Sequence, residues 1–260
     1  MEKLNCSIEN NKNLLECKTR PKPLTPYFGG KAKVADEIIA QFPEHNTFVE
    51  PFVGGGSLYW ANTRAEKYVI NDLNKDIYTL YRTAKDSPQA VKSCAVNKLN
   101  SKEEFDKVRD KSSHTACDVI ALHKNAFSGS PKNGFAKKDR PLLNRFGENH
   151  VAKLKKTVIL NQDFRKVMER YDLNNTAIYL DPPYVKGGDA YNTHGVSPKE
   201  VCDAVKKLKR AKAIISYDDS PQVREACKGL KFDKISFLYS SGNTHWGKNI
   251  TKTELLIKNY

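Results

Sequence analysis

The stretch FVEPFVGGGS, at residues 48–57, is a short apolar run that ends in three consecutive glycines. Apolar residues continue from Leu58, which predicts a strand, a tight glycine turn and a helix in that order. The next apolar run, residues 68–71, ends at Asp72, and a helical period then continues to Ala84. This βαβα alternation is typical of a parallel sheet that is covered by helices.

The alternation stops near residue 85 and resumes near residue 157. We interpret residues 25–84 and 157–260 as one α/β catalytic domain, residues 85–156 as a mostly helical insert, and residues 1–24 as a polar extension. Within the insert, helices are predicted at 90–99, 102–109 and 118–127. After it, strands are predicted at 158–160, 177–180, 213–217, 235–239 and 254–257, with helices at 165–171, 198–209 and 221–227.

The chain is strongly basic, with a formal charge of +14 and a pI near 9.4. Residues 124–156 contain nine Lys and Arg against two acidic residues, so this segment supplies +7, half of the total. Clustered cations favour a polyanionic partner, because neutralising phosphates releases counterions. We therefore expect double-stranded DNA as the partner. A basic protein with no role in nucleic-acid binding is the alternative at this point.

No apolar run is long enough to span a membrane, and the N-terminus lacks the pattern of a secretory signal. We expect a cytoplasmic protein with no membrane partner. The six cysteines are scattered singly along the chain, with no C-x-x-C pair. We expect reduced thiols and no metal site.

Two further strand ends carry polar residues, and ligands of open α/β sheets bind at such ends. Asp72 ends the strand after the glycine turn, where a carboxylate can accept hydrogen bonds from ribose hydroxyls. A helix N-cap explains this residue as well. The segment DPPY, at residues 181–184, is the most specific signal in the chain. Acceptance of both hydrogens of an exocyclic amine there would localise its lone pair for attack on an electrophilic methyl group, while Tyr184 stacks on the base.

Together these stretches resemble the Dam-type family of DNA adenine-N6 methyltransferases. The segment YFGGK at residues 27–31 is similar to the family's opening motif, which usually begins with Trp, and TELLI at 253–257 resembles its last strand. The resemblance implies a Rossmann-like class I methyltransferase with a seven-stranded sheet and a mostly helical DNA-recognition insert. It further implies a site-specific enzyme that transfers a methyl group from S-adenosylmethionine to N6 of a flipped-out adenine.

Residue roles follow from the resemblance and from the strand-end motifs. The expected catalytic residues are Asp181, Pro182, Pro183 and Tyr184. The expected cofactor contacts are Tyr27, Lys31, Glu50, Phe52, Gly54, Gly56, Ser57, Asp72, Asp163, Phe164 and Asp181. The expected DNA contacts are Lys124, Asn125, Lys132, Lys137, Lys138, Arg140, Arg145 and Tyr191.

Several alternatives remain open at this stage. The acceptor could instead be cytosine N4 in DNA or an amino group in RNA, and a catalytically silent DNA-binding protein would keep the same pocket. The family's N-R-x-x-x-N-G stretch is replaced here by HKNAFSG at residues 123–129, so the family's GATC site is not carried over. A cognate restriction endonuclease is a further candidate partner, and we expect a monomer or weak dimer.

Overall fold

The computed structural model describes residues 20–94, 99–137, 146–184, 196–239 and 250–260. Its centre is one seven-stranded sheet in the order β3-β2-β1-β4-β5-β7-β6. The strands are β1 (Thr47–Glu50), β2 (Lys67–Asn71), β3 (Thr157–Leu160), β4 (Thr176–Leu180), β5 (Lys212–Asp218), β6 (Lys231–Tyr239) and β7 (Ile250–Lys258). The first five are parallel, whereas β7 runs antiparallel to both of its neighbours. The predicted seven-stranded α/β fold is confirmed.

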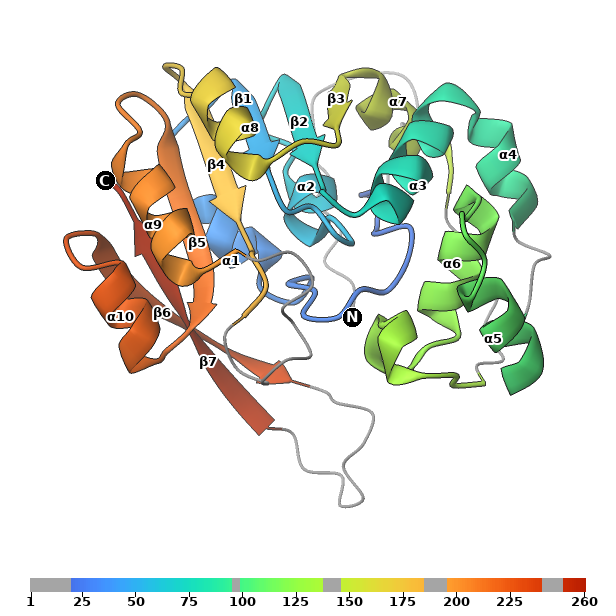
Figure 1. The fold of residues 1–260 in the computed structure, drawn as a ribbon. Coiled ribbons are helices and arrows are strands. Elements are labelled where there is room, and N and C mark those ends of the chain that lie inside the picture. The colour runs from blue at the N-terminus through green and yellow to red at the C-terminus, as the bar shows by residue number, and fades with distance from the viewer. Residues whose placement is uncertain (1–19, 95–98, 138–145, 185–195, 240–249) are drawn as a thin grey trace, which may run out of the picture.

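Helices cover both faces of the sheet, giving three layers (Figure 1). One face packs against α1 (Ala35–Ala40), α2 (Ser57–Ala61) and α3 (Lys75–Asp86). The other packs against α8 (Phe164–Arg170), α9 (Pro198–Lys206) and α10 (Pro221–Ala226). Because β4 is covered on both faces, all five of its residues are buried. A continuous apolar strand of this kind is what a parallel sheet between two helical layers requires.

Helix α3 illustrates how the local sequence fixes an element. Its buried residues Ile77, Leu80, Tyr81 and Ala84 recur at the three- and four-residue spacing of one helical face. The helix begins after Asn74, whose side-chain oxygen accepts a hydrogen bond of 2.9 Å from the backbone N–H of Asp76. That side chain satisfies one of the donors that a helix start leaves free.

Between α3 and β3 the chain forms α4 (Pro88–Ser93), α5 (Lys102–Arg109), α6 (Ala116–Lys124) and α7 (Glu148–Lys155). In Figure 1 helices α4 to α6 lie beside the sheet, on the side where β3 forms its edge. Val119 and Ile120 of α6 belong to the same buried cluster as α3. A separate small cluster is formed by Phe105, Leu122 and Ala126. The apolar core of the insert is therefore partly continuous with that of the sheet. Helix α7 was not predicted from the sequence.

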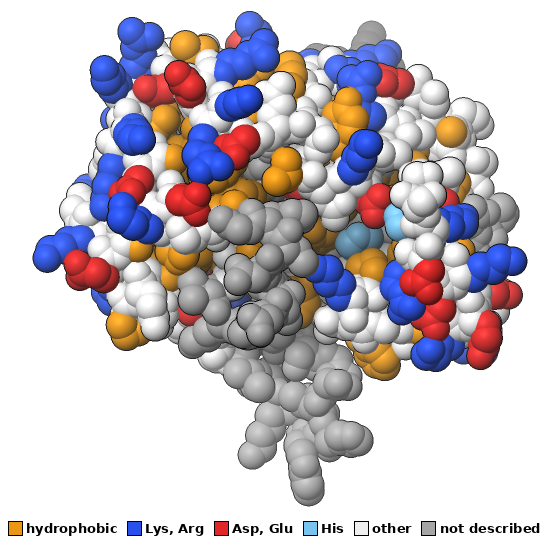
Figure 2. Space-filling view, in the orientation of Figure 1, with side chains coloured by type: hydrophobic (Ala, Val, Ile, Leu, Met, Phe, Trp, Pro, Cys, Tyr) orange, Lys and Arg blue, Asp and Glu red, His pale blue; other side chains and the backbone are white. Residues whose placement is uncertain are grey.

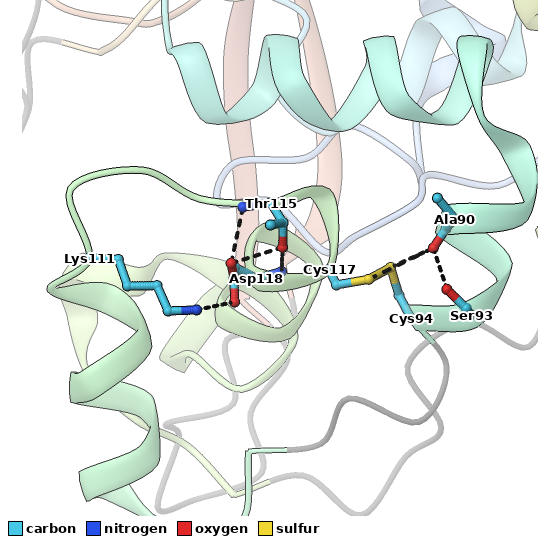
Figure 3. The surroundings of a disulfide bond; sticks show 7 residues. All are labelled: Ala90, Ser93, Cys94, Lys111, Thr115, Cys117 and Asp118. Carbon is cyan, nitrogen blue, oxygen red and sulfur yellow. Dashed lines mark hydrogen bonds and ion pairs between the residues drawn. A yellow bond between two sulfur atoms is a disulfide. The ribbon is translucent and has the colours of Figure 1, made fainter.

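Four cysteines correct the expectation of reduced thiols. Cys94, at the end of α4, forms a disulfide with Cys117 in the first turn of α6 (Figure 3), and Cys202 of α9 forms one with Cys227 after α10. The Cα atoms are 5.0 and 5.1 Å apart, within the range that a disulfide spans. The cysteines of the two pairs are separated by 23 and 25 positions in the sequence, and helix packing brings them together. The spacing of single cysteines does not reveal this pairing.

Within the described ranges, no helix is both long and apolar enough to cross a membrane. The same part of the chain contains no group of three or more His, Cys, Asp and Glu side chains arranged to hold a metal ion.

Candidate active site

A cavity of about 1000 Å³ opens at the carboxyl ends of the parallel strands. Each residue predicted to be catalytic or to contact the cofactor lines it, including the DPPY segment, the glycine turn and Asp72. Residues of the insert close the cavity from the other side, among them Arg109, His114, His123 and Lys132. The structure therefore brings together motifs that lie between positions 27 and 184 of the sequence.

The turn after β1 requires glycine for two reasons. Gly54 and Gly56 have φ values of +45° and +67°, in the left-handed region that side chains disfavour. A Cβ atom on Gly54 would also lie 2.7 Å from the ring of Tyr27, and one on Gly56 would lie 2.5 Å from the hydroxyl of Tyr81. The glycines thus allow Tyr27 to pack directly over the turn, where it also stacks on His123 at 5.2 Å.

Asp72 holds the next strand end in a defined shape. Its carboxylate accepts backbone hydrogen bonds of 2.9 Å from Gly54 and from Asn74. Because Asn74 is the N-cap of α3, the capping role that the sequence also allowed for Asp72 belongs to its neighbour. Asp72 instead joins the glycine turn to the loop after β2, at the wall of the cavity.

Asn71 was not singled out from the sequence, yet it connects three loops around the cavity. Its amide nitrogen donates to the carbonyls of Pro51 at 2.9 Å and Gln162 at 3.0 Å, and its amide oxygen accepts from the N–H of Gln162 at 2.9 Å. The side chain is 2% exposed. A buried amide with this many partners fixes the ends of β1, β2 and β3 relative to one another.

Lys31 and Asp181 form the central ion pair of the site. The Nζ atom of Lys31 donates to both carboxylate oxygens of Asp181 at 2.9 Å and to the carbonyl of Gly29 at 2.9 Å. Burial alone lowers the pKa of Lys31, but Asp181 and then Glu254 raise it, and the net shift is upward. Burial raises the pKa of Asp181, and Lys31 opposes that shift. Lys31 therefore stays protonated and fixes the orientation of the Asp181 carboxylate.

Tyr184 lies beside this pair, with its ring centroid 5.0 Å from the Nζ of Lys31 and 5.8 Å from the Tyr217 ring. Its hydroxyl donates to a carboxylate oxygen of Glu254 in β7 at 2.8 Å. Burial raises the pKa of Tyr184, and the nearby carboxylates of Asp181 and Glu254 raise it further. The hydroxyl stays protonated and anchors the ring.

Other expected cofactor contacts also have structural partners. Glu50 is 3% exposed and accepts the backbone N–H of Tyr59 at 2.8 Å; burial raises its pKa. Asp163 is the N-cap of α8. Phe164 is largely buried in the cavity wall, and its ring lies 5.1 Å from that of Phe52.

Sequence reasoning missed two carboxylates near the DPPY segment. Glu254 contacts Tyr184 and Lys31 from behind, and Asp218 at the end of β5 lines the cavity. Asp218 is 4% exposed, and its carboxylate oxygens have no hydrogen-bond partner among the described residues. The available signal was an acidic residue directly next to an apolar run, Asp218 after residues 213–217 and Glu254 before Leu255.

The residues predicted to contact DNA differ in their exposure to solvent. Lys132 and Lys137 are exposed, and Lys132 lines the cavity. Lys124 is half-buried, and burial lowers its pKa to about 8. Asn125 is a correction: it is 3% exposed and its amide donates to the carbonyl of Ala121 at 2.9 Å, so its side chain is not available to DNA. Lys138, Arg140, Arg145 and Tyr191 lie outside the described residues.

Basic charge is not confined to the insert. In Figure 2, Lys and Arg side chains are spread over much of the coloured surface, interspersed with Asp and Glu. Several of these cations are paired, such as Arg165 with Glu200 at 2.9 Å and Lys199 with Asp203 at 2.6 Å. The net charge of the chain therefore does not by itself locate a DNA-binding surface. Lys132, which lines the cavity, is a more specific candidate for DNA contact.

A family model described as D12 class N6 adenine-specific DNA methyltransferase matches residues 27–240. The chain belongs to this family. This D12-class methyltransferase is 28% identical to the type II methyltransferase M1.LlaDCHI of Lactococcus lactis subsp. cremoris, over 95% of this chain and 99% of that protein. It is 27% identical to a DNA adenine methylase of Haemophilus influenzae, covering 88% of this chain and 90% of that one. The type II methyltransferase M.CviBI of Paramecium bursaria Chlorella virus NC1A is also 27% identical, over 92% and 100%.

Among solved structures, a putative methyltransferase from Streptococcus mutans in complex with SAH aligns over 87% of this chain and 96% of that one, with a TM-score of 0.36 and 11% identity. The family match confirms the predicted assignment to the adenine-N6 DNA methyltransferases.

Proposed function

We propose that this D12-class enzyme transfers a methyl group from S-adenosylmethionine to N6 of an adenine that has been rotated out of a specific site in duplex DNA. The observation that carries the proposal is the convergence of Asp181, Lys31 and Tyr184 on the same cavity as the glycine turn and Asp72. One wall can hold a nucleoside cofactor, and the adjacent wall can hold the amine that it methylates.

The cavity suits the cofactor in size and in chemistry. Ligand pockets occupy roughly 300–1000 Å³, so a cavity at the upper end of that range leaves room for an acceptor base beside the cofactor. Asp72 presents a carboxylate suited to ribose hydroxyls, while Phe52 and Phe164 present apolar surface suited to a purine ring. S-adenosylmethionine would supply a methyl group on a positively charged sulfur.

The acceptor base would be held by the DPPY segment. Each carboxylate oxygen of Asp181 has two lone pairs, so one hydrogen bond from Lys31 leaves capacity for an amine hydrogen of the base. The carbonyl of Pro182 would accept the second amine hydrogen, and the ring of Tyr184 would stack on the base. Since the Lys31 ammonium fixes the carboxylate, the chain contributes positioning rather than strong base catalysis.

DNA would approach from the side where the insert meets the cavity. Lys132 lies at that boundary and is exposed, so it can contact a phosphate near the extruded base. Lys137, four residues after the end of η3 (Pro131–Asn133), extends the same basic segment. Extraction of a base requires a few kcal/mol of unstacking, which phosphate contacts of this kind can offset.

The decisive experiment supplies radiolabelled S-adenosylmethionine to the purified protein with unmethylated duplex DNA, RNA or a protein mixture. Digestion of the DNA to nucleosides then identifies the labelled product. We expect label in N6-methyl-2′-deoxyadenosine from duplex DNA and none when Asp181→Ala replaces the wild type. Label in N4-methyl-2′-deoxycytidine, or label only in RNA, would contradict the proposal.

A further inference from the structure

Glu254 is a carboxylate inside the sheet, in a strand whose next three residues, Leu255 to Ile257, are fully buried. Its own exposure is 1%. It lies opposite Asp218 in the register between β7 and β5. Burying a carboxylate is costly unless partners compensate for the lost hydration. The contacts of Glu254 therefore indicate what this position is for.

Those contacts all lead toward the DPPY segment. One carboxylate oxygen accepts the hydroxyl of Tyr184 at 2.8 Å and lies 3.5 Å from the Nζ of Lys31. The other oxygen accepts from the Nζ of Lys252 at 2.5 Å. One side chain thus joins the last strand, the loop before α1 and the segment after β4.

The ring of Tyr184 is held at its hydroxyl and has two ammonium groups near it. Its hydroxyl is bonded to Glu254, and the ammonium groups of Lys31 and Lys252 each lie 5.0 Å from its centroid. Hydrogen bonds to a charged acceptor are shorter and stronger than neutral ones, and cations near an aromatic ring add further attraction. Glu254 contacts all three of these groups but does not itself line the cavity.

We propose that Glu254 is a positioning residue for methyl transfer, which holds the Tyr184 ring and the Lys31 ammonium in register without touching either substrate. This inference rests on the function proposed above, in which Tyr184 stacks on the acceptor base and Asp181 receives its amine. Loss of Glu254 frees the Tyr184 ring to rotate, while Lys31 keeps its contacts with Asp181 and Gly29. The rate of the chemical step should fall, and binding of cofactor and DNA should change little.

The test compares kcat and KM for Glu254→Ala, Glu254→Gln, Tyr184→Phe and the double variant Tyr184→Phe/Glu254→Ala, using labelled methyl transfer to unmethylated duplex DNA. We expect Glu254→Ala to lower kcat about 100-fold, because misplacement of a positioning group has effects of that size. Glu254→Gln should recover kcat to within about tenfold of the wild type, since its amide oxygen can still accept from the Tyr184 hydroxyl. KM for the cofactor should stay within about threefold.

Comparing the double variant with the two single variants distinguishes a positioning role of Glu254 from an effect on stability alone. In the Tyr184→Phe background the hydroxyl is absent, so Glu254→Ala should lower kcat by no more than about threefold further. Full additivity of the two losses would overturn the inference. So would a drop in cofactor affinity with unchanged kcat. All variants are assayed below their unfolding temperatures, as determined by circular dichroism.

Asp233→Asn is the matched control, because it removes a carboxylate from the same β6–β7 pair. Asp233 is paired with Lys258 at 2.5 Å, is half exposed and lies outside the cavity. Its kcat should equal that of the wild type. An active wild type with Glu254→Ala indistinguishable from Asp233→Asn would refute the role of Glu254 alone. A wild type that transfers no methyl group to any acceptor would refute the proposed function, and this inference with it.

Discussion

The Nζ atom of Lys31 lies 2.9 Å from each carboxylate oxygen of Asp181, although 150 positions separate the two residues in the chain. The contact joins the loop before α1 to the segment after β4. The Lys31 side chain is 3% exposed, so little water screens its charge. A pair of this kind is costly to break by removing one partner, because the other charge stays buried.

Replacement of Lys31 by Met should therefore lower the free energy of unfolding by about 3 kcal/mol. The double variant Lys31→Met/Asp181→Asn removes both charges and should recover most of that loss. Neither variant should transfer methyl groups. Urea denaturation measures the stability, and methyl incorporation measures the activity. A double variant as unstable as Lys31→Met would contradict the account of the pair.

Asp72 offers a test of how the cofactor is recognised. If its carboxylate accepts ribose hydroxyls, a cofactor analogue without those hydroxyls should bind the wild type about 10- to 100-fold more weakly than the product S-adenosylhomocysteine does. For Asp72→Asn the two ligands should differ much less. Titration calorimetry gives the four affinities. An equal preference in both proteins would show that Asp72 only shapes the turn at Gly54.

Lys153 of α7 should make stability depend on pH. Burial, reinforced by the positive charge of Arg20, lowers its pKa from 10.5 to about 7. Its Nζ lies 4.0 and 5.0 Å from the ring centroids of Tyr68 and Tyr59. Between pH 7 and 10.5 the unfolded chain binds more protons at this lysine than the folded protein does, so its contribution to stability rises with pH.

The measurement compares the free energies of unfolding of the wild type and Lys153→Met from pH 6 to pH 10. Other titrating groups are common to both proteins and cancel in the difference. The wild type should gain stability relative to Lys153→Met as the pH rises above about 7. Parallel curves would mean that this lysine keeps an ordinary pKa in the folded protein.

The two disulfides predict a thiol count. Of the six cysteines in the chain, four are joined in the pairs Cys94–Cys117 and Cys202–Cys227. Alkylation of denatured protein without reductant, followed by mass spectrometry, should leave these four cysteines unmodified. Prior reduction should expose all of them. Full alkylation without reductant would restore the original expectation of reduced thiols.

Lys132 should contribute to DNA affinity through phosphate contact. Lys132→Ala should weaken binding to duplex DNA and reduce the slope of log affinity against log salt concentration by about 1. Lys199→Ala is the control, because Lys199 lies on α9, is paired with Asp203 and does not line the cavity. Equal effects of the two substitutions would assign the interaction to net charge alone.

The parts of the fold that the sequence predicted are those with a strong local pattern. Strands β1 and β2 are buried except at their first residues, so each appears in the sequence as a short, mainly apolar run. Helix α3 buries one face, so its apolar residues recur at helical spacing. Helix α7 escaped prediction because only His150 and Leu154 of its eight residues are buried. Its position depends on packing against α3 and β3, which no local pattern specifies.

In the site, the strand-end motifs predicted the cavity walls but not the residues behind them. DPPY and the glycine turn are recognisable because each needs a particular backbone. Asn71 and Glu254 act through long-range hydrogen bonds, across 91 and 70 positions, and their partners become apparent only when the strands are in order. The disulfides went unpredicted because helix packing, not local spacing, brings each pair of cysteines together.

The shared core of α6 and α3 limits how the segment between α3 and β3, which we propose reads the DNA sequence, can be exchanged. Val119 and Ile120 pack into the cluster that also holds Leu80 and Tyr81, so residues 85–156 do not pack independently of the sheet and its helices. A graft of residues 85–156 from a relative with another target site would leave α3 facing a foreign apolar surface. Productive chimeras should therefore transplant α3 together with residues 85–156, or retain α6.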